Sequence, residues 1–184
     1  MRSIVLCEKP SQARNIFKAV GRSYGDVVAA RGHLLRLAFP HEERPDWKKW
    51  STDLLRPPSG RYSLRPDDDV GKGECLQRIR AALSGADTVF IATDCDREGQ
   101  AIAEHILGYL QFQGSVRRVI FTAEDELSLA SAFAAAVDNA QYRHLYDAAI
   151  ARQQADQIFN LSLTRAATVS MVPPGVRSVI GVGR

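Results

Sequence analysis

The chain has 184 residues, 45% hydrophobic and 24% charged, which allows one folded domain or slightly more and excludes a disordered or fibrous protein. Its formal net charge of +3 at pH 7 permits a polyanionic partner without demonstrating one. The three cysteines, Cys7, Cys75 and Cys95, are odd in number and far apart, so a disulfide framework and a zinc knuckle are not expected. Since no stretch approaches the roughly 20 apolar residues of a membrane span, we expect a cytoplasmic protein that is neither secreted nor inserted in a membrane.

The N-terminal part of the chain predicts buried strands alternating with a helix. Residues 4–7 form a short apolar run, typical of a strand in a parallel sheet that is covered on both faces. A helix follows from Ser11, a good N-cap residue, and Gly21 is its expected end. Residues 26–31 predict a second strand, which leads into the sequence Gly-His-Leu at residues 32–34.

Residues 40–72 differ in character from the segments on either side. They hold five of the eight prolines and both tryptophans, among charges of both signs. We expect a long irregular insertion, and long excursions of this kind in compact domains are often functional. The acidic run at residues 67–69 has the chemistry of a metal-ligand set, but a solvated turn is the interpretation that we favour.

Strands and helices alternate again after the insertion. Residues 74–83 predict an amphipathic helix, residues 87–93 the clearest buried strand, residues 100–110 a helix and residues 116–121 another strand. Thr122 has the character of an N-cap for a further helix. This order is typical of right-handed βαβ units, so we predict an α/β fold with an open, mainly parallel, Rossmann-like sheet and flanking helices.

The alternation stops after about residue 138. Residues 141–171 are largely helical in pattern, and the Pro-Pro-Gly sequence at residues 173–175 ends that pattern. We therefore predict an α/β domain over residues 1–138, interrupted by the 40–72 insertion. The start of a second, α-helical unit is expected over residues 139–184.

Three acidic residues, Asp94, Asp96 and Glu98, lie where the 87–93 strand meets the following helix. Residues i and i+2 of an extended segment point the same way, so the two aspartates can converge on one point. Ligands of open α/β sheets bind at the carboxyl ends of the strands. Carboxylates this close repel one another unless a cation neutralises them, and oxygen ligands with room for water suit Mg²⁺. The alternative is a solvated acidic turn.

Glu8 stands at the end of the first predicted strand and therefore opens onto the same sheet edge as Asp94. A carboxyl group beside a metal ion and a phosphate can donate or accept a proton. The adjacent Lys9 has the charge to neutralise a phosphate, although taken alone it would count as an ordinary exposed basic residue.

Several motifs, in family order, resemble those of type IA DNA topoisomerases. The sequences CEKPSQARNI at residues 7–16, GHL at residues 32–34 and ATDCDREGQAIAEHI at residues 92–106 are similar to the Toprim module of that family. ARQQADQIFNLSLTRAAT at residues 151–168 and the closing VGR resemble the start of its DNA-gate domain. The EKPS form at residues 8–11 is more similar to the topoisomerase III branch than to topoisomerase I, whose counterpart usually reads ESPAK.

The resemblance implies roles for the residues at matching positions. Asp94, Asp96 and Glu98 would hold Mg²⁺, Glu8 would be the general acid and base near the scissile phosphate, and Lys9 would steady that phosphate. The positions that match the family's single-strand DNA groove are Arg152, Asp156, Arg165 and Arg184. A charged helix face is the alternative there, and the TRA motif makes Arg165 the stronger candidate.

Basic side chains in that groove would bind DNA phosphates in a sequence-tolerant and salt-sensitive way. Trp47 and Trp50 could stack on DNA bases, but we expect them to cover the edge of a core instead. One departure from the family lies at residues 160–162, which read Asn-Leu-Ser where Gly-x-Asn is common. The other is that none of the five tyrosines fits the family's catalytic YxRTD segment, which lies far beyond the Toprim motifs.

The sequence therefore predicts an N-terminal fragment of a type IA topoisomerase that is inactive alone. The full enzyme would use Mg²⁺ in single-strand cleavage, strand passage and religation of single-stranded or negatively supercoiled DNA. It would work in the bacterial cytoplasm, with a monomer as the default oligomeric state. The alternatives are a free-standing Toprim nuclease or primase-like phosphotransfer enzyme, and a non-enzymatic Toprim module that recruits DNA or a partner.

Overall fold

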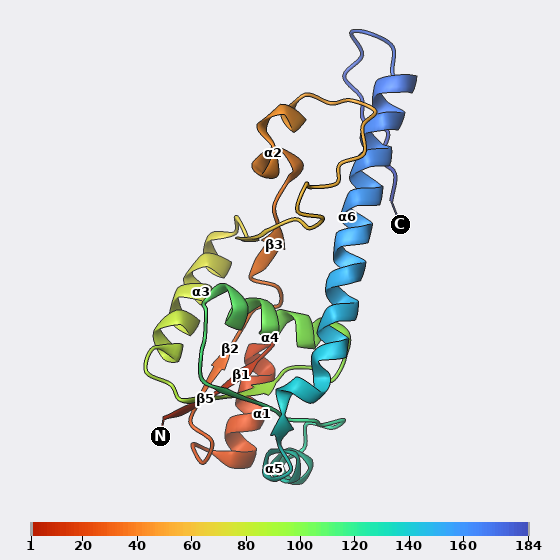
Figure 1. The fold of residues 1–184 in the computed structure, drawn as a ribbon. Coiled ribbons are helices and arrows are strands. Elements are labelled where there is room, and N and C mark those ends of the chain that lie inside the picture. The colour runs from red at the N-terminus through yellow and green to blue at the C-terminus, as the bar shows by residue number, and fades with distance from the viewer. Residues whose placement is uncertain (1, 184) are drawn as a thin grey trace. The chain divides into compact units, whose positions relative to one another are not determined.

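The computed structural model describes residues 2–183, and the chain divides into two compact units (Figure 1). The first unit combines Met1–Arg36 with Pro66–Ala149, and the second combines Leu37–Arg65 with Ile150–Arg184. Each unit is thus assembled from two segments that are distant in the sequence. Within residues 2–183, no helix has both the length and the apolar character needed to cross a membrane.

A five-stranded sheet in the order β2-β1-β5-β6-β7 forms the centre of the first unit. Its strands are β1 (Ser3–Cys7), β2 (Asp26–Ala29), β5 (Thr88–Ala92), β6 (Ser115–Arg118) and β7 (Val137–Asp138). The strands β2, β1, β5 and β6 are parallel to their neighbours, and β7 is antiparallel to β6. The central strand β1 is buried at every residue after Ser3, because both faces of a parallel sheet are covered.

Helices flank this sheet on both sides (Figure 1). The helices α1 (Pro10–Val20) and α5 (Glu126–Ala134) lie on one side, and α3 (Val70–Leu83) and α4 (Arg97–Tyr109) lie on the other. A short 3-10 helix, η2 (Asn139–Tyr142), follows β7. The predicted fold class, an open and mainly parallel α/β sheet with flanking helices, is confirmed.

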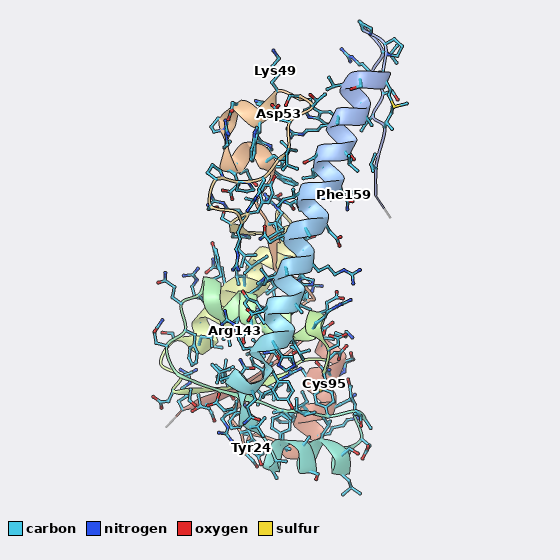
Figure 2. The ribbon with its side chains drawn as sticks, turned by 45° about the vertical axis from the view of Figure 1, so that its right-hand side comes forward. Tyr24, Lys49, Asp53, Cys95, Arg143 and Phe159 are labelled. Carbon is cyan, nitrogen blue, oxygen red and sulfur yellow. The ribbon has the colours of Figure 1, made fainter. Side chains whose placement is uncertain are left out.

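A hydrophobic core fills the space between the sheet and the α1 and α5 helices. Val5 and Ala92 of the central strands pack there with Ile16 of α1 and Phe133 of α5. The ring of Tyr24 (Figure 2) extends this core, with its centroid 4.9 Å from that of Phe133. Burial of these apolar side chains stabilises the sheet and fixes the loops at its carboxyl edge.

The second unit contains α2 (Pro40–Glu43), the 3-10 helix η1 (Pro45–Lys48) and most of the long helix α6 (Arg143–Met171). A two-stranded sheet pairs β3 (Leu35–Leu37) with β4 (Leu64–Pro66). The hydrophobic core of this unit contains the buried residues Ala38, Trp47, Leu55 and Tyr62, packed with Leu37, Ile158 and Leu161. After α6 the chain turns back, and the backbone N–H of Ile180 donates to Oγ1 of Thr168 over 3.0 Å.

Residues 40–72, which the sequence predicts to be a long irregular insertion, form no helix or strand over residues 49–63. The segment contains α2, η1 and β4, and its apolar side chains form a core with α6. Leu55 donates its backbone N–H to the buried Oγ of Ser162, so the segment depends on the C-terminal helix for its hydrogen bonds. The division of the chain into domains at residue 138 stays a prediction.

Four helix starts differ from the sequence prediction. Helix α1 begins at Pro10 with Lys9, not Ser11, as its N-cap, and helix α4 begins at Arg97 instead of residue 100. Helix α3 begins at Val70, because Asp69 caps it by accepting a hydrogen bond from the backbone N–H of Lys72 at 2.9 Å. Helix α5 begins at Glu126 and is capped by Asp125, whose carboxylate accepts from Ser128 N–H at 3.0 Å. Thr122 is therefore not the N-cap. A carboxylate at the N-terminus also gains from the helix dipole.

Candidate functional site

The carboxyl ends of β1 and β5 bring the predicted acidic residues to one edge of the sheet. These two strands are adjacent and parallel, and Cys7 is in register with Ala92. Glu8 and Lys9 leave the sheet at the end of β1, and Asp94 leaves it at the end of β5. The structure thus brings Glu8, Lys9 and Asp94 together, as the order of the strands predicts.

Asp94 is held by two donors from the N-terminal part of the chain. Its Oδ2 accepts a hydrogen bond from Lys9 Nζ at 3.0 Å, and its Oδ1 accepts from Gln12 Nε2 at 3.0 Å. Burial raises the pKa of Asp94, but the hydrogen bonds from Lys9 and Gln12 outweigh burial, so this pKa lies below its ordinary value. Asp94 is therefore ionised at neutral pH.

Glu8 lies beside this pair in a different electrostatic environment. Its carboxylate is 3.6 Å from Lys9 Nζ. Burial, and then the negative charge of Asp94, raise the pKa of Glu8 more than the charge of Lys9 lowers it. Neighbouring carboxyl groups whose pKa values are pushed in opposite directions are typical of sites where one group transfers a proton and the other stays charged.

Asp96 and Glu98 occupy the start of α4. Asp96 is the N-cap of the helix, and its Oδ1 accepts a hydrogen bond from Gly99 N–H at 2.8 Å. The side chain of Glu98 is 72% exposed, and its Oε1 is 3.6 Å from Nε2 of His33. Gly99 is required here, because a Cβ atom at this position would lie 2.3 Å from the carbonyl oxygen of Asp94.

The donor set at this edge fits Mg²⁺ in its chemistry. Glu8, Asp94, Asp96 and Glu98 provide only oxygen ligands, and Mg²⁺ typically takes one or two carboxylates together with waters and phosphate oxygens. Among residues 2–183, no three His, Cys, Asp or Glu side chains already form a metal-binding group. The structure therefore brings Glu8 and Asp94 together but does not gather Asp94, Asp96 and Glu98 into a formed metal-binding group.

Arg118 stabilises the loop that carries Asp94 by hydrogen bonds to the loop backbone. The sequence analysis did not single out this residue. This residue is fully buried at the end of β6. Its guanidinium donates to the carbonyl oxygens of Thr93 at 3.0 Å and Asp94 at 2.7 Å. A signal was present in the sequence, since Arg117 and Arg118 are two charged residues inside the run 116–121, whose other four residues are apolar.

Gln12 and Glu124 are two further polar residues at this edge that the sequence analysis missed. Gln12 is buried on α1, where it shares the inward face with Ile16, one helical turn away. A polar residue on the apolar face of a helix is the signal that could have drawn attention to it. Glu124 comes from the loop before α5, and nothing in its local sequence distinguishes it.

The predicted DNA-binding residues have different surroundings in the second unit. Arg152 and Asp156 form an exposed ion pair one turn apart on α6, with 3.5 Å between Nε and Oδ2. Arg165 is buried, donates to the carbonyl oxygen of Trp47 and lies 5.5 Å from the ring centroid of Trp50. Arg184 lies outside the described residues.

The remaining predictions concern the tryptophans and the acidic run. Trp47 is buried in the core of the second unit, as expected, and Trp50 is 39% exposed. The acidic run forms a turn in which each carboxylate has a partner. Asp69 caps α3, and the other two aspartates form ion pairs, Asp67 with Lys72 and Asp68 with Arg36.

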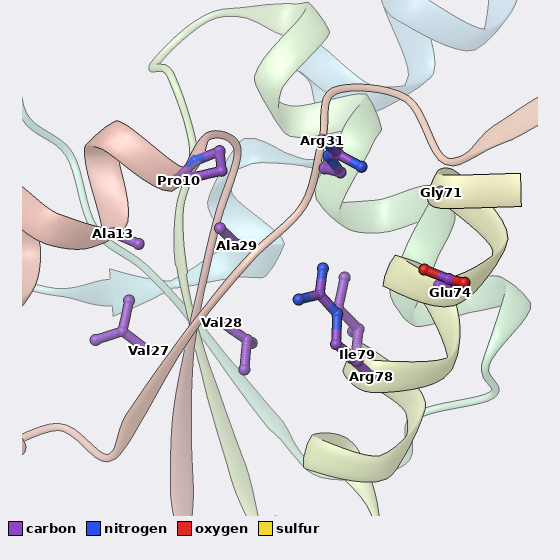
Figure 3. Close-up of a pocket in the computed structure, with 10 residues that line it drawn as sticks. All are labelled: Pro10, Ala13, Val27, Val28, Ala29, Arg31, Gly71, Glu74, Arg78 and Ile79. Carbon is purple, nitrogen blue, oxygen red and sulfur yellow. The ribbon is translucent and has the colours of Figure 1, made fainter. Parts of the chain in front are cut away.

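A cavity of about 610 Å³ opens between β2 and α3, as Figure 3 shows. Val27 and Val28 of β2 form one wall, and the polar lining residues are Arg31, Glu74 and Arg78. None of the lining residues labelled in Figure 3 is a predicted catalytic or metal-binding residue. The candidate site is therefore the open carboxyl edge of the sheet and not this cavity.

Comparison with known proteins shows the family to which this chain is similar. A family model described as "Toprim domain" matches residues 3–123. The chain is 29% identical over 177 residues to the protein named DNA topoisomerase 3 from Bacillus anthracis, covering 91% of this chain and 24% of the relative. It is 30% identical over 183 residues to DNA topoisomerase 3 from Staphylococcus haemolyticus, covering 91% of this chain and 25% of the relative.

A solved structure of similar fold is the full-length topoisomerase I from Thermotoga maritima. It has a TM-score of 0.70 at 21% sequence identity, and the match covers 98% of this chain and 27% of that chain. At this level of identity the comparison shows a common fold. The chain spans about a quarter of the length of the curated relatives.

Proposed function

We propose, on the premise that this chain belongs to the Toprim family, that it supplies the metal-binding and proton-transfer half of a type IA DNA topoisomerase. The relatives named DNA topoisomerase 3 confirm the resemblance to the topoisomerase III branch. The observation that carries the proposal is the meeting of Glu8, Lys9 and Asp94 at the carboxyl edge of β1 and β5.

In this proposal Asp94, Asp96 and Glu98 hold Mg²⁺, which when bound would stabilise negative charge on phosphate oxygens. Glu8 donates or accepts the proton of the reacting oxygen, and its raised pKa suits that exchange. Lys9 has its Nζ between Glu8 and Asp94, and its ammonium group steadies the scissile phosphate. The half-exposed position of Lys9 lets its side chain reach a bound strand.

The nucleophile of the proposed reaction is a tyrosine outside these 184 residues. The coverage supports this assignment, because the chain matches about a quarter of each relative. The substrate is single-stranded or negatively supercoiled DNA in the bacterial cytoplasm. Arg152 on the exposed face of α6 is the candidate phosphate contact, with Asp156 as its partner in the free protein.

Arg165 has a less direct place in DNA binding. Its guanidinium donates a hydrogen bond to Trp47 and lies over the ring of Trp50, so we propose that it stabilises the second unit. A contact between Arg165 and DNA would require this buried side chain to leave its carbonyl partner. Arg184 keeps its predicted role as a DNA contact on the motif resemblance alone.

Two measurements on the 184-residue chain test the proposal together. Titration calorimetry with Mg²⁺ should show binding that Asp94→Asn weakens at least about tenfold, because one ligand charge is lost. Asp26→Asn, at the opposite end of β2 from the site, should leave the affinity unchanged. Supercoiled plasmid incubated with the chain and Mg²⁺ should remain supercoiled, because the nucleophile is absent.

The alternatives predict other results on the same gel. Nicked circles that Asp94→Asn abolishes would replace the proposal with a Toprim nuclease, in which the carboxylates activate water. Relaxed topoisomers would show that a tyrosine within the chain is the nucleophile. Absence of Mg²⁺ binding would contradict the metal assignment itself.

A further inference from the structure

We propose that Gln12 and Glu124 are positioning residues of this site: a buried amide, oriented by the carboxylate of the exposed Glu124, fixes Asp94 and Glu8 in the arrangement that receives Mg²⁺. This inference rests on the proposed function, because it concerns the same carboxyl edge. Gln12 belongs to α1 and Glu124 to the loop between β6 and α5, so the pair joins elements that are 112 residues apart.

Gln12 uses both ends of its amide at the site. The side chain is 1% exposed, so water cannot replace its partners. Its Oε1 accepts the backbone N–H of Glu8 at 2.9 Å. Its Nε2 donates to Asp94 Oδ1 at 3.0 Å and to Glu124 Oε1 at 3.1 Å. One side chain therefore holds the backbone of the proposed proton-transfer residue and the side chain of the proposed ligand.

Glu124 helps to fix the orientation of the Gln12 amide. A glutamine amide can exchange the places of its oxygen and nitrogen by a half-turn. The backbone N–H of Glu8 requires an oxygen at one end, and the carboxylates of Asp94 and Glu124 require the NH₂ group at the other. The second oxygen of Glu124 accepts from Asn15 Nδ2 at 2.7 Å, so Glu124 is itself held in place.

An amide suits this position better than a second cation would. Lys9 already neutralises part of the charge of Asp94, and its side chain is 52% exposed. Gln12 donates a hydrogen bond without adding charge, so the carboxylate keeps its attraction for a divalent cation. Because Gln12 is buried and has three partners, it is also the more rigid of the two donors. Such indirect support of a metal ligand typically changes metal affinity by about 10- to 100-fold.

Mg²⁺ titration calorimetry on the 184-residue chain tests the inference. We expect Gln12→Leu to weaken Mg²⁺ binding about tenfold or more, and Glu124→Gln to weaken it by a smaller factor. The matched control is Gln77→Leu, an exposed glutamine of α3, which should bind Mg²⁺ like the wild type. Circular dichroism and urea unfolding establish that each variant is folded.

A spectroscopic readout separates positioning from a merely structural role. The Nε2–H₂ signals of Gln12 in a nitrogen–proton NMR spectrum should shift when Mg²⁺ is added to the wild type, and Asp94→Asn should remove that response. If Gln12→Leu does not fold, Glu124→Gln and these signals still decide the question.

The outcomes distinguish this inference from the proposed function. A folded Gln12→Leu variant with wild-type Mg²⁺ affinity would overturn the positioning role and leave the proposed function standing. Gln12 amide signals that ignore Mg²⁺, in a chain that binds it, would do the same. A wild-type chain that binds no Mg²⁺ would overturn both, since no ion would remain for Gln12 to position.

Discussion

Two buried glutamines, Gln12 in the first unit and Gln154 in the second, form hydrogen bonds to different kinds of partner. Gln12 bonds two carboxylates as well as one backbone N–H. Gln154 bonds only backbone, accepting from Tyr62 N–H at 2.8 Å and donating to the Tyr62 carbonyl at 3.1 Å. The first arrangement orients charge, whereas the second joins a helix to an irregular segment.

Arg118 and Arg165 are buried arginines of the two units that both donate to backbone carbonyls, but the residues that carry these carbonyls differ. Arg118 donates to the carbonyl groups that lead into Asp94, so its position bears on the acidic loop. Arg165 donates to the carbonyl of Trp47 and lies over Trp50, and neither tryptophan leads into a predicted ligand. Gln12 and Arg118 thus bear on the candidate site, because their partners are its carboxylates or the backbone that carries them. Gln154 and Arg165 are scaffolding residues, because their backbone partners carry no predicted ligand.

The largest expected effect is that of Gly99→Ala, which introduces a steric clash with the backbone of the acidic loop. The new Cβ would lie 2.3 Å from the carbonyl oxygen of Asp94, a backbone atom that cannot rotate away. We expect a loss of about 3 kcal/mol in the free energy of unfolding, measured by urea denaturation. Mg²⁺ affinity should fall in the same variant, because Asp94 and Asp96 are carried by this loop.

Gly108→Ala is the matched control in the same helix. A Cβ atom at Gly108 has no neighbour within 4 Å, so the substitution should raise stability by up to about 1 kcal/mol through helix propensity. Equal stability of the two variants would contradict the close approach at Gly99.

Gln154→Leu tests the scaffolding side of the comparison. The substitution leaves the buried N–H and carbonyl of Tyr62 without partners, which should cost about 2–3 kcal/mol. Hydrogen exchange should accelerate at Tyr62, while Mg²⁺ affinity stays at the wild-type value. The half-buried neighbour Gln153 provides the control, Gln153→Leu. Loss of Mg²⁺ binding in Gln154→Leu would show that the two roles are not separate.

His105 is a buried polar residue that fits neither the site group nor the scaffolding group. Its role is tested by measuring the free energy of unfolding as a function of pH. The residue is buried on α4, and neither ring nitrogen has a hydrogen-bond partner among residues 2–183. Its ring lies edge-on to that of Tyr146, with 5.6 Å between centroids. Burial, and to a lesser degree the charge of His33, lower the pKa of His105 to about 4.

The sign of the pH dependence follows from this lowered pKa. Protonation is easier in the unfolded chain, where the pKa is 6.5, so the stabilising effect is present above that pH and is lost as pH falls towards 4. Between pH 7.5 and pH 5 the loss should be about 2 kcal/mol. His105→Phe should remove this component, measured as the difference between wild-type and variant urea curves at the two pH values. A constant difference would show that His105 is not buried in the neutral form.

The fold could be predicted because the strands have a recognisable local sequence pattern. The runs at residues 4–7 and 87–93 are continuously apolar, and their burial in β1 and β5 confirms the prediction. The start of α3 was missed because Gly71 and Gly73 are poor helix formers, while the cap that overrides them, Asp69, lies in the acidic run.

The candidate site could be predicted only where a strand end determines it. Glu8 and Asp94 follow adjacent parallel strands, so their proximity follows from topology. Glu124 meets Gln12 across 112 residues, and Arg165 meets Trp47 across 118, through contacts that no local pattern records. A polar residue on an apolar face is visible in the sequence. Its hydrogen-bond partner is determined by tertiary packing and could not be predicted.

The smallest expected effect separates two roles of a single carboxylate, Asp96, which is the cap of α4 and a proposed Mg²⁺ ligand. Serine also caps helices well, so Asp96→Ser should keep the hydrogen bond to Gly99 N–H and unfold at nearly the wild-type urea concentration. Asp96→Ala removes the cap and should cost about 1 kcal/mol. Both variants lack the carboxylate, so both should bind Mg²⁺ more weakly than the wild type by the same factor. If Asp96→Ser retained full Mg²⁺ affinity, Asp96 would have only a scaffolding role, like that of Gln154 in the second unit. Asp94 and Glu98 alone would then remain as the proposed ligands.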